Sequence, residues 1–382
     1  MSEATFLEKL LDGAEVEWVA LGEVVKIKHG KNWKKLNSGN IPVYGSGGIM
    51  GHVDTYSCNK PTVLIPRKGS ITNIFYVESP LWNVDTIFYT EIDNNTLTPK
   101  YFYHFMKTVD LLSLDTGSGR PSLTQTILNK IQIPIPCPDN PEESLAIQAE
   151  IVRILDTFTE LTAELTAELT AELTARKKQY NYYRDQLLTF EEGEVELVPL
   201  ANDHFFEIAN RGRRPVKASL RIPGETPYYG ANNVQDYVEG HTHDGEFVLI
   251  AEDGSASLEK YSIQYAVGMF WANNHVHVVA GKEGVNTRYL YHLLCTLNFI
   301  PYLSGGGRAK LTKGKLSEIP IPIPPLPEQA RIVAILDKFD TLAHSISEGL
   351  PREIELRQKQ YEYYRDLLLN FPKSEPQTEI VA

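Results

Sequence analysis

The chain has 382 residues, enough for two or three folded domains, and 42% of them are apolar, which suffices for ordinary packed cores. No apolar run is long enough to span a bilayer, and the acidic first residues lack the features of a signal peptide, so we expect a cytoplasmic protein. Three widely spaced cysteines, with no CxxC pair, argue against a disulfide framework or a zinc knuckle.

The net charge of −12 at first argues against a nucleic-acid partner, but the acidic residues are unevenly distributed. Residues 20–136 carry a net charge of +4 and residues 195–324 carry −1, whereas residues 137–194 carry −8. A DNA duplex could therefore contact the first two segments, although bulk positive charge would not supply the affinity.

The sequence contains an internal duplication with a period near 180 residues. Seven motifs recur in the same order, which chance explains poorly. A period of this length indicates duplicated domains rather than a solenoid of short repeats. The pairs are EVEWVAL at 15–21 with EVELVPL at 194–200, IPVYG at 41–45 with TPYYG at 226–230, TVLIPRKGS at 62–70 with FVLIAEDGS at 247–255, YFYHFM at 101–106 with YLYHLL at 289–294, TGSGRPSLTQTILNKIQIPIP at 116–136 with SGGGRAKLTKGKLSEIPIPIP at 304–324, EIVRILDTF at 150–158 with RIVAILDKF at 331–339, and KKQYNYYRDQLLTF at 177–190 with QKQYEYYRDLLLNF at 358–371.

Each copy begins with a compact part, at about 20–136 and 195–324, in which short strand-like runs alternate with glycine, asparagine and proline breaks. Helical spacing at 99–112 and 287–297 predicts a helix in each part. We therefore expect two duplicated α+β domains with many loops.

A long helix is predicted after each compact part. The IPIP motif ends that part, because proline lacks an N–H and restricts the residue before it. Apolar residues then repeat at helical spacing for about 40 residues, with Gly349 and Pro351 as breakers in the second copy. A helix of about 60 Å needs a partner, so we expect the two to pack as an antiparallel coiled coil. The run LTAELTAELTAELTA at 161–175 is interpreted as a spacer of adjustable length, as an amphipathic stretch, or as both.

The helical blocks resemble the conserved regions of the specificity subunits of type I restriction-modification systems, and the TAEL run resembles the repeat of the IC branch. The resemblance covers nearly the whole chain. It implies target-recognition domains at 1–140 and 191–326, a central helical region at 141–190 and a C-terminal helical region at 327–382. It also implies a bipartite asymmetric target in double-stranded DNA, two modification (methyltransferase) subunits and restriction (motor-nuclease) subunits as partners. S-adenosylmethionine, ATP and Mg would then belong to those partners, with no cofactor in this chain.

No catalytic motif stands out in the chain. NPPY-like or DPPY-like motifs of adenine methylation, GxxxxGK[ST] and HExxH are all absent. HTHDGE at 241–246 places two histidines near two acids, but a polar loop is the better interpretation because the first copy has no counterpart. We therefore expect a non-catalytic subunit of an adenine-specific methyltransferase and endonuclease complex. A duplicated protein-binding scaffold without DNA specificity is the alternative, and a self-contained nuclease is a less favoured third class.

Candidate DNA contacts lie in loops where both copies keep small and polar residues. Glycine lets the backbone approach phosphates, arginine and lysine supply charge, and asparagine can pair with adenine. A solvated turn is the competing interpretation for each single residue. The predicted DNA-contacting residues are Ser46, Arg67, Lys68, Ser70, Ser118, Arg120, Arg211, Arg213, Arg214, Asn232, Asn233, Ser255, Arg308, Lys310 and Lys313, and we expect neither catalytic nor metal-binding residues.

Overall fold

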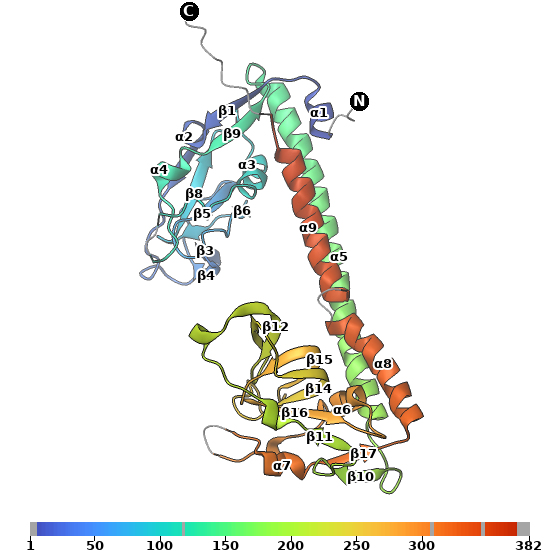
Figure 1. Ribbon diagram of the computed structural model, residues 1–382. Helices are drawn as coiled ribbons and strands as arrows, with labels where there is room; N and C mark the ends of the chain where they lie inside the picture. The colour runs from blue at the N-terminus through green and yellow to red at the C-terminus, as the bar shows by residue number, and fades with distance from the viewer. Residues whose placement is uncertain (1–5, 117–118, 306–308, 345–347, 373–382) are drawn as a thin grey trace, which may run out of the picture. The chain divides into compact units, whose positions relative to one another are not determined.

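The computed structural model describes residues 6–116, 119–305, 309–344 and 348–372. The chain divides into two compact units, one of Met1–Ala167 with Glu355–Ala382 (unit 1) and one of Glu168–Ile354 (unit 2). Each unit combines a strand-rich domain with paired helices, and helix α5 (Pro141–Leu187) contributes to both (Figure 1). The predicted fold class, two α+β domains with long helices that pack together, is confirmed.

The domain of unit 1 is built from three small sheets. One pairs β1 (Val16–Ala20) with β9 (Gln132–Pro136) in antiparallel fashion. The second has the order β2 (Val25–Lys28), β8 (Ile87–Ile92), β5 (Thr62–Pro66) and β6 (Phe75–Val77). The third has the order β4 (Gly48–Val53), β3 (Ile41–Gly45) and β7 (Trp82–Asn83). The short helices are α1 (Phe6–Leu11), α2 (Leu21–Val24), α3 (Pro99–Met106) and α4 (Gln125–Leu128).

The domain of unit 2 repeats this design with two sheets. Strands β10 (Glu196–Pro199) and β17 (Pro320–Ile323) form the counterpart of the β1–β9 pair. The large sheet has the order β11 (Phe206–Ile208), β16 (Val276–Gly281), β14 (His243–Ala251), β15 (Ile263–Ala272), β12 (Pro223–Tyr229) and β13 (Val234–Val238). The helical elements are η1 (Asn210–Gly212), η2 (Ala218–Leu220), α6 (Thr287–Leu294), η3 (Ile300–Tyr302) and α7 (Lys313–Ser317).

The IPIP motif forms the last strand of each domain. Among the described residues of unit 1, strand β9 pairs with β1 alone, so no described strand lies on its other edge. Proline is tolerated on such edge strands because its missing N–H interrupts no ladder. The motifs that open and close each copy, EVEWVAL with IPIP and EVELVPL with IPIP, are therefore hydrogen-bonded to each other. This pairing closes the domain just before the long helix starts.

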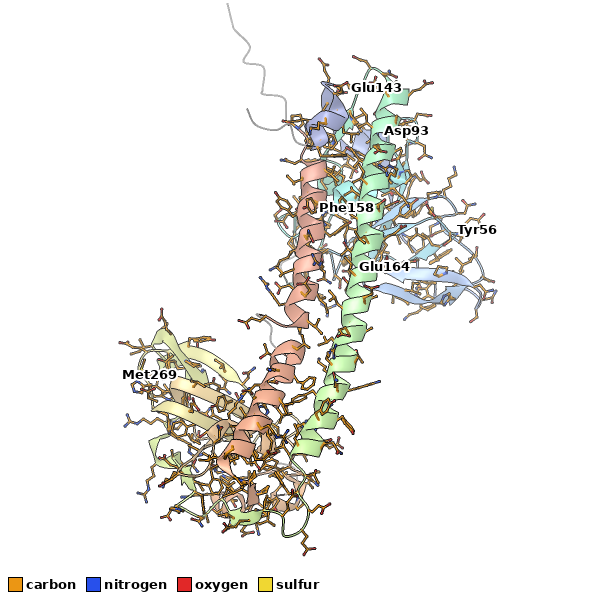
Figure 2. All side chains as sticks on the ribbon, turned by 90° about the vertical axis from the view of Figure 1, so that its right-hand side faces the viewer. Tyr56, Asp93, Glu143, Phe158, Glu164 and Met269 are labelled. Atoms are coloured by element: carbon orange, nitrogen blue, oxygen red, sulfur yellow. The ribbon has the colours of Figure 1, made fainter. Side chains whose placement is uncertain are left out.

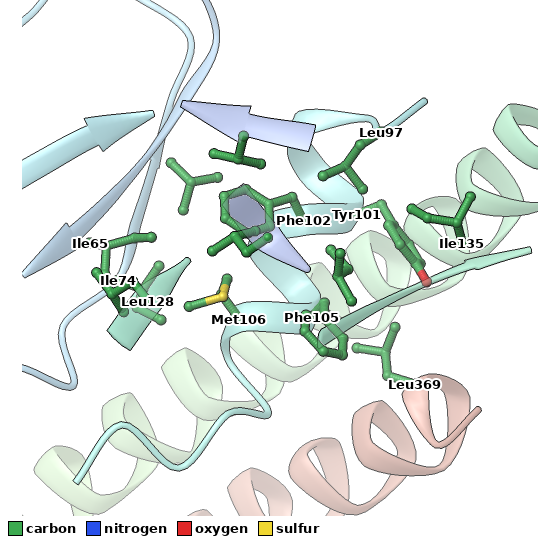
Figure 3. Close-up of a cluster of buried hydrophobic side chains, with 14 of the residues drawn as sticks. Ile65, Ile74, Leu97, Tyr101, Phe102, Phe105, Met106, Leu128, Ile135 and Leu369 are labelled. Carbon is green, nitrogen blue, oxygen red and sulfur yellow. The ribbon is translucent and has the colours of Figure 1, made fainter. Parts of the chain in front are cut away.

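A single helix fills the centre of each domain. In unit 1, Tyr101, Phe102 and Phe105 of α3 are buried, and they lie in a core that also contains Leu369 from the C-terminal helix α9 (Leu350–Leu369; Figure 3). The Tyr101 hydroxyl, which burial would otherwise leave unpaired, donates to the Pro134 carbonyl at 2.8 Å. The equivalent Tyr289 of α6 donates to the Pro322 carbonyl at 3.0 Å, so the IPIP strand holds the same helix in both units.

A buried glutamine docks each domain on its long helix. In unit 1 the Oε1 atom of Gln148 accepts a hydrogen bond from the N–H of Thr98 at 2.9 Å, and its Nε2 atom donates to the Thr96 carbonyl. In unit 2, on helix α8 (Leu326–His344), the Oε1 atom of Gln329 accepts from the N–H of Asn286 at 2.8 Å. These backbone groups lie just before α3 and α6, where helix starts leave amide groups unpaired.

A histidine–aspartate pair repeats about two turns further along each long helix, eight residues after the glutamine. In unit 1 the Nε2 atom of His104 lies 3.0 Å from Asp156, which also accepts from Lys100. In unit 2 the Nε2 atom of His292 lies 2.7 Å from Asp337. Burial lowers the pKa of both imidazoles despite the neighbouring carboxylates, so both are neutral and donate through Nε2–H. Sequence reasoning did not identify these docking contacts.

The long helices pair through stacked aromatic rings within each unit. Phe158 of α5 stacks on Tyr364 of α9 in unit 1, with ring centroids 5.5 Å apart, and it lies on the side of α5 that faces α9 (Figure 2). Tyr183 of α5 stacks on Phe339 of α8 in unit 2 at the same distance. The paired helices are antiparallel, as expected (Figure 1). Of the two breakers of the second copy, Gly349 lies between α8 and α9, and Pro351 occupies the first turn of α9, where its missing N–H costs no hydrogen bond.

Candidate nucleic-acid interface

In unit 1 the loops that carry the predicted DNA contacts converge on one turn. This segment, residues 82–86, comprises β7 and the turn from β7 to β8, and we call it the hub turn of unit 1. The Thr86 carbonyl accepts from the Arg67 N–H at 2.8 Å, and its Oγ1 atom accepts from the Ser46 N–H at 3.3 Å. The β3–β4 turn and the loop after β5 are therefore held side by side.

The end of the Gly-rich segment, at Pro121 and Ser122, joins the same group of loops. The Gly69 N–H donates to the Pro121 carbonyl at 3.0 Å, and Lys68 and Ser122 form an isolated antiparallel bridge. Gly69 has a φ of +86°, which residues with a Cβ rarely adopt, and an added Cβ would lie 3.2 Å from the Ser46 Oγ atom. The structure thus brings Ser46, Lys68 and the exposed Arg120 to one edge of the domain; Ser118 lies outside the described residues.

Unit 2 contains the same arrangement around residues 271–275, the hub turn of unit 2. The His275 carbonyl accepts from the Glu252 N–H at 2.8 Å, as Thr86 does from Arg67. The amide side chain of Asn232 joins the β12–β13 loop to the β14–β15 loop. Its Nδ2 atom donates to the Gly254 carbonyl, and its Oδ1 atom accepts from the Ala256 N–H. Asn232 is therefore engaged in holding the loops together. Arg308 lies outside the described residues.

The two interfaces differ in charge at equivalent places. Glu252 of unit 2 occupies the position that Arg67 has in unit 1. The backbone N–H of each residue donates to its hub turn. The backbone carbonyl of Glu252 accepts from the Leu311 N–H, and that of Arg67 accepts from the Leu123 N–H. Arg213 and Lys310 bind the Glu252 carboxylate at 2.6 Å and 3.0 Å. Burial alone would raise the pKa of Glu252, but the hydrogen bonds from both cations outweigh it and hold the pKa below its ordinary range.

The side chains of the remaining predicted residues differ in their exposure and in their hydrogen bonds within the domain. Ser255 is tied into its own loop, since its Oγ atom donates to the Ser257 carbonyl and accepts from the Ser262 N–H. Asn233 accepts from the N–H of the next residue. The exposed ones are Ser70 in unit 1 and Arg211, Arg214, Asn233 and Lys313 in unit 2.

Neither a cluster of metal ligands nor a membrane-spanning helix is present in the part of the chain that the structure describes. No group of three or more histidine, cysteine or acidic side chains there could hold a metal ion. The HTHDGE segment was expected to be a polar loop, but its last four residues open strand β14, so that expectation is wrong. His243 is buried and bonded to Thr242 and to the Ala209 carbonyl, which gives it a structural role. None of the described helices is long and apolar enough to cross a membrane.

Comparison with known proteins identifies the class of fold. The family model described as the type I restriction modification DNA specificity domain matches residues 14–175 and again 195–356. The chain is 39% identical to the EcoR124I/EcoR124II specificity subunit of Escherichia coli, over 98% of this chain and 99% of that one. It is 62% identical to a putative type I specificity subunit of Haemophilus influenzae, but over only 47% of each chain. A crystal structure of a type I S subunit from M. genitalium matches 95% of this chain and 98% of that one, with 17% identity and a TM-score of 0.50.

Both halves are thus DNA specificity domains, and the chain belongs to the family of type I restriction-modification specificity subunits. In this role it recognises a DNA target and is itself non-catalytic. The predicted family and function are confirmed.

Proposed function

We propose that each unit reads one half of a bipartite, asymmetric target in double-stranded DNA, through the loops around its hub turn. In this proposal the long helices separate the two reading domains and bind two modification subunits, which restriction subunits join in the cytoplasm. S-adenosylmethionine, ATP and Mg serve the partners. The family membership and the E. coli relative, a restriction-enzyme specificity subunit, support this assembly.

One observation carries the proposal. The two units share the same main-chain hydrogen bonds around their hub turns but present different side chains there. The loop after β5 has Arg67 and Lys68, whereas the loop after β14 has Glu252 and Asp253 at the same backbone positions. Direct readout of bases depends on the hydrogen-bonding groups that side chains present. Two such loops are suited to different base sequences, which is what an asymmetric target requires.

The contacts within the domains refine the predicted set. We assign Ser46, Lys68, Ser70 and Arg120 to the DNA-facing side of unit 1, together with Arg67. In unit 2 we assign Arg211, Arg214, Asn233 and Lys313 to it, and Ser118 and Arg308 remain predictions of the sequence. The hydroxyl of Ser255 is engaged within its own loop, which supports a role in shaping that loop. Arg213, Lys310 and Asn232 are engaged with Glu252 or with loop backbone, which supports a role in shaping the loops.

Exchange of one domain tests the proposal. Residues 20–136 are replaced by the matching segment of another specificity subunit, the chimera is co-expressed with its modification subunits, and methylated sites are read genome-wide. We expect one half of the motif to change and the other half to stay. The reciprocal control replaces residues 195–324 and is expected to change the opposite half. A change in both halves from a single exchange would contradict the assignment of one half-site to each unit.

A further inference from the structure

The hub turns hold a second duplicated feature that the repeated motifs do not reveal. In unit 1 the indole Nε1–H of Trp82 donates to the Lys31 carbonyl at 3.1 Å, and the Lys31 N–H donates to the Asn83 carbonyl at 3.0 Å. In unit 2 the indole of Trp271 donates to the Arg214 carbonyl at 2.7 Å. The Arg214 N–H donates to the carbonyl of the residue after that tryptophan, Ala272, at 3.0 Å.

The strands around these tryptophans establish that Lys31 and Arg214 are equivalent positions. Strand β7 pairs in parallel with β3, with Trp82 opposite Val43. Strand β15 pairs in parallel with β12, with Trp271 opposite Tyr228. Within the repeated motifs IPVYG and TPYYG, Val43 and Tyr228 are the same position. Trp82 and Trp271 are therefore equivalent positions. Lys31 and Arg214, whose backbone groups they bind, are equivalent as well.

We infer that Lys31 and Arg214 are equivalent contacts to DNA phosphates, each set in place by the tryptophan of its hub turn. This inference rests on the proposed function, because it assigns part of the same DNA-facing edge. Both side chains are exposed, and neither forms an ion pair with any residue that the structure describes. They lie beside the turns that hold the reading loops, since the hub turn of unit 1 also binds the backbone of Ser46 and Arg67.

Phosphate is favoured over a base for a simple chemical reason. Lysine and arginine share a positive charge, but only arginine has the planar fork that pairs with a base edge at two points. The reading loops differ between the two units, whereas this position keeps its charge. The phosphate backbone is the part of DNA that is the same at every half-site, and contacts to it position a protein without reading sequence.

The backbone around Lys31 is closely fitted, which suits a positioning role. A Cβ atom at Gly30 would collide with the Val84 carbonyl of the hub turn, so glycine is required there. Trp82 itself packs against a cluster that contains Val43, Val53 and Val84. The flexible lysine side chain thus starts from a fixed point, and less conformational freedom is lost on binding.

The test uses the full-length chain assembled with its modification subunits. The probes are a duplex that carries the motif found by methylation sequencing and an unrelated duplex of equal length. We expect Lys31→Ala and Arg214→Ala each to weaken binding several-fold on both duplexes, and to reduce the dependence of log K on log salt concentration by about one. Lys31→Arg and Arg214→Lys should bind as the wild type does. Lys9→Ala, which removes an exposed charge on α1, is the matched control.

Trp82→Phe keeps a large ring but removes the indole N–H, and circular dichroism checks that the variant stays folded. We expect it to weaken binding, with less than the additive effect when combined with Lys31→Ala, because both changes act on one contact. This inference would be overturned if the Lys31→Ala and Arg214→Ala variants bound DNA like the Lys9→Ala control. The proposed function would stand if the wild type still methylated a split motif. Loss of affinity confined to the target duplex in Arg214→Lys would indicate a base contact and overturn it too. Absence of any split motif would instead reject the proposed function.

Discussion

The side chain of Gln148 binds the backbone just before α3 in the same way as the side chain of Gln329 binds the backbone just before α6. Both glutamines are fully buried, and each joins a domain to its long helix. The buried amide group therefore helps to fix the position of the reading loops relative to the helix within a unit, together with the histidine–aspartate pair.

We expect Gln148→Ala to lower the free energy of unfolding by about 1–3 kcal/mol, because it leaves the Thr98 N–H and the Thr96 carbonyl unpaired in a buried site. Chemical denaturation followed by circular dichroism measures this. Gln186→Ala, at an exposed position of α5, is the matched control, with an expected change within about 0.5 kcal/mol. Equal effects of the two substitutions would contradict the docking role.

Three of the buried histidines predict a pH dependence of stability. Burial lowers the pKa of His104, His277 and His292 below the ordinary value of 6.5. The unfolded chain then binds protons at a higher pH than the folded chain does. Stability is therefore full above about pH 6.5 and declines as pH falls below it toward the folded pKa values. Denaturation series between pH 8 and pH 5 should show this decline.

His104→Gln and His292→Gln provide the control for that series, since glutamine retains a donor for the aspartate but does not titrate in this range. The double variant should show a shallower decline between pH 6.5 and pH 5 than the wild type. An unchanged slope would assign the pH dependence to other groups.

Adjacent arginines in unit 2 are expected to behave in opposite ways. Arg213 has a side chain only 16% exposed, and it binds Glu252 and the Val276 carbonyl, so Arg213→Ala should cost on the order of 2 kcal/mol of stability. Arg214→Ala should leave stability within about 0.5 kcal/mol of the wild type and weaken DNA binding instead. Thermal denaturation and binding assays on the two variants check this, and a reversed pattern would exchange the two roles.

The TAEL run predicts the length of the spacer between the two half-sites. Deleting residues 166–169 shortens α5 by about 6 Å and turns its distal part by about 40°. Duplex DNA rises about 3.4 Å and turns roughly 35° per base pair. The change in helix length allows a spacer change of one or two base pairs, whereas the change in rotation favours one. Rotation decides between them, because a domain facing the wrong side of the duplex makes no base contacts. Genome-wide methylation of the deletion variant should therefore show a spacer one base pair shorter with unchanged half-sites. An unaltered spacer would indicate that the run serves only as a tether or a docking face.

The duplication and most of the secondary structure were predictable because they depend on local patterns. The runs at 62–66 and 247–251 are strands, and the helices at 99–106 and 287–294 lie where helical spacing indicated. The prolines of the IPIP motif predict a break before each long helix, but they do not predict the pairing of this strand with the opening strand, since strand partners distant in sequence leave no local signal.

The convergence of the reading loops on the hub turns could not be predicted for the same reason. Trp82 and Trp271 are 189 residues apart, whereas Gly69 and Gly254 in the nearby loops are 185 apart, so a fixed offset does not align them. Lys31 was missed because its local sequence, GKNWKK, has no visible likeness to RGRR. A search for tryptophans that follow the repeated loops at slightly different offsets would have found the pair.

The hub turns hold their loops largely through main-chain atoms, and this has a consequence for evolution. The Arg67 and Glu252 positions make the same backbone hydrogen bonds although their side chains carry opposite charges. Substitutions in these loops can therefore alter the chemistry offered to DNA while the backbone path is kept. A lineage can acquire a new target by a few point mutations, without passing through an unfolded intermediate, as long as the glycines and tryptophans of the framework remain.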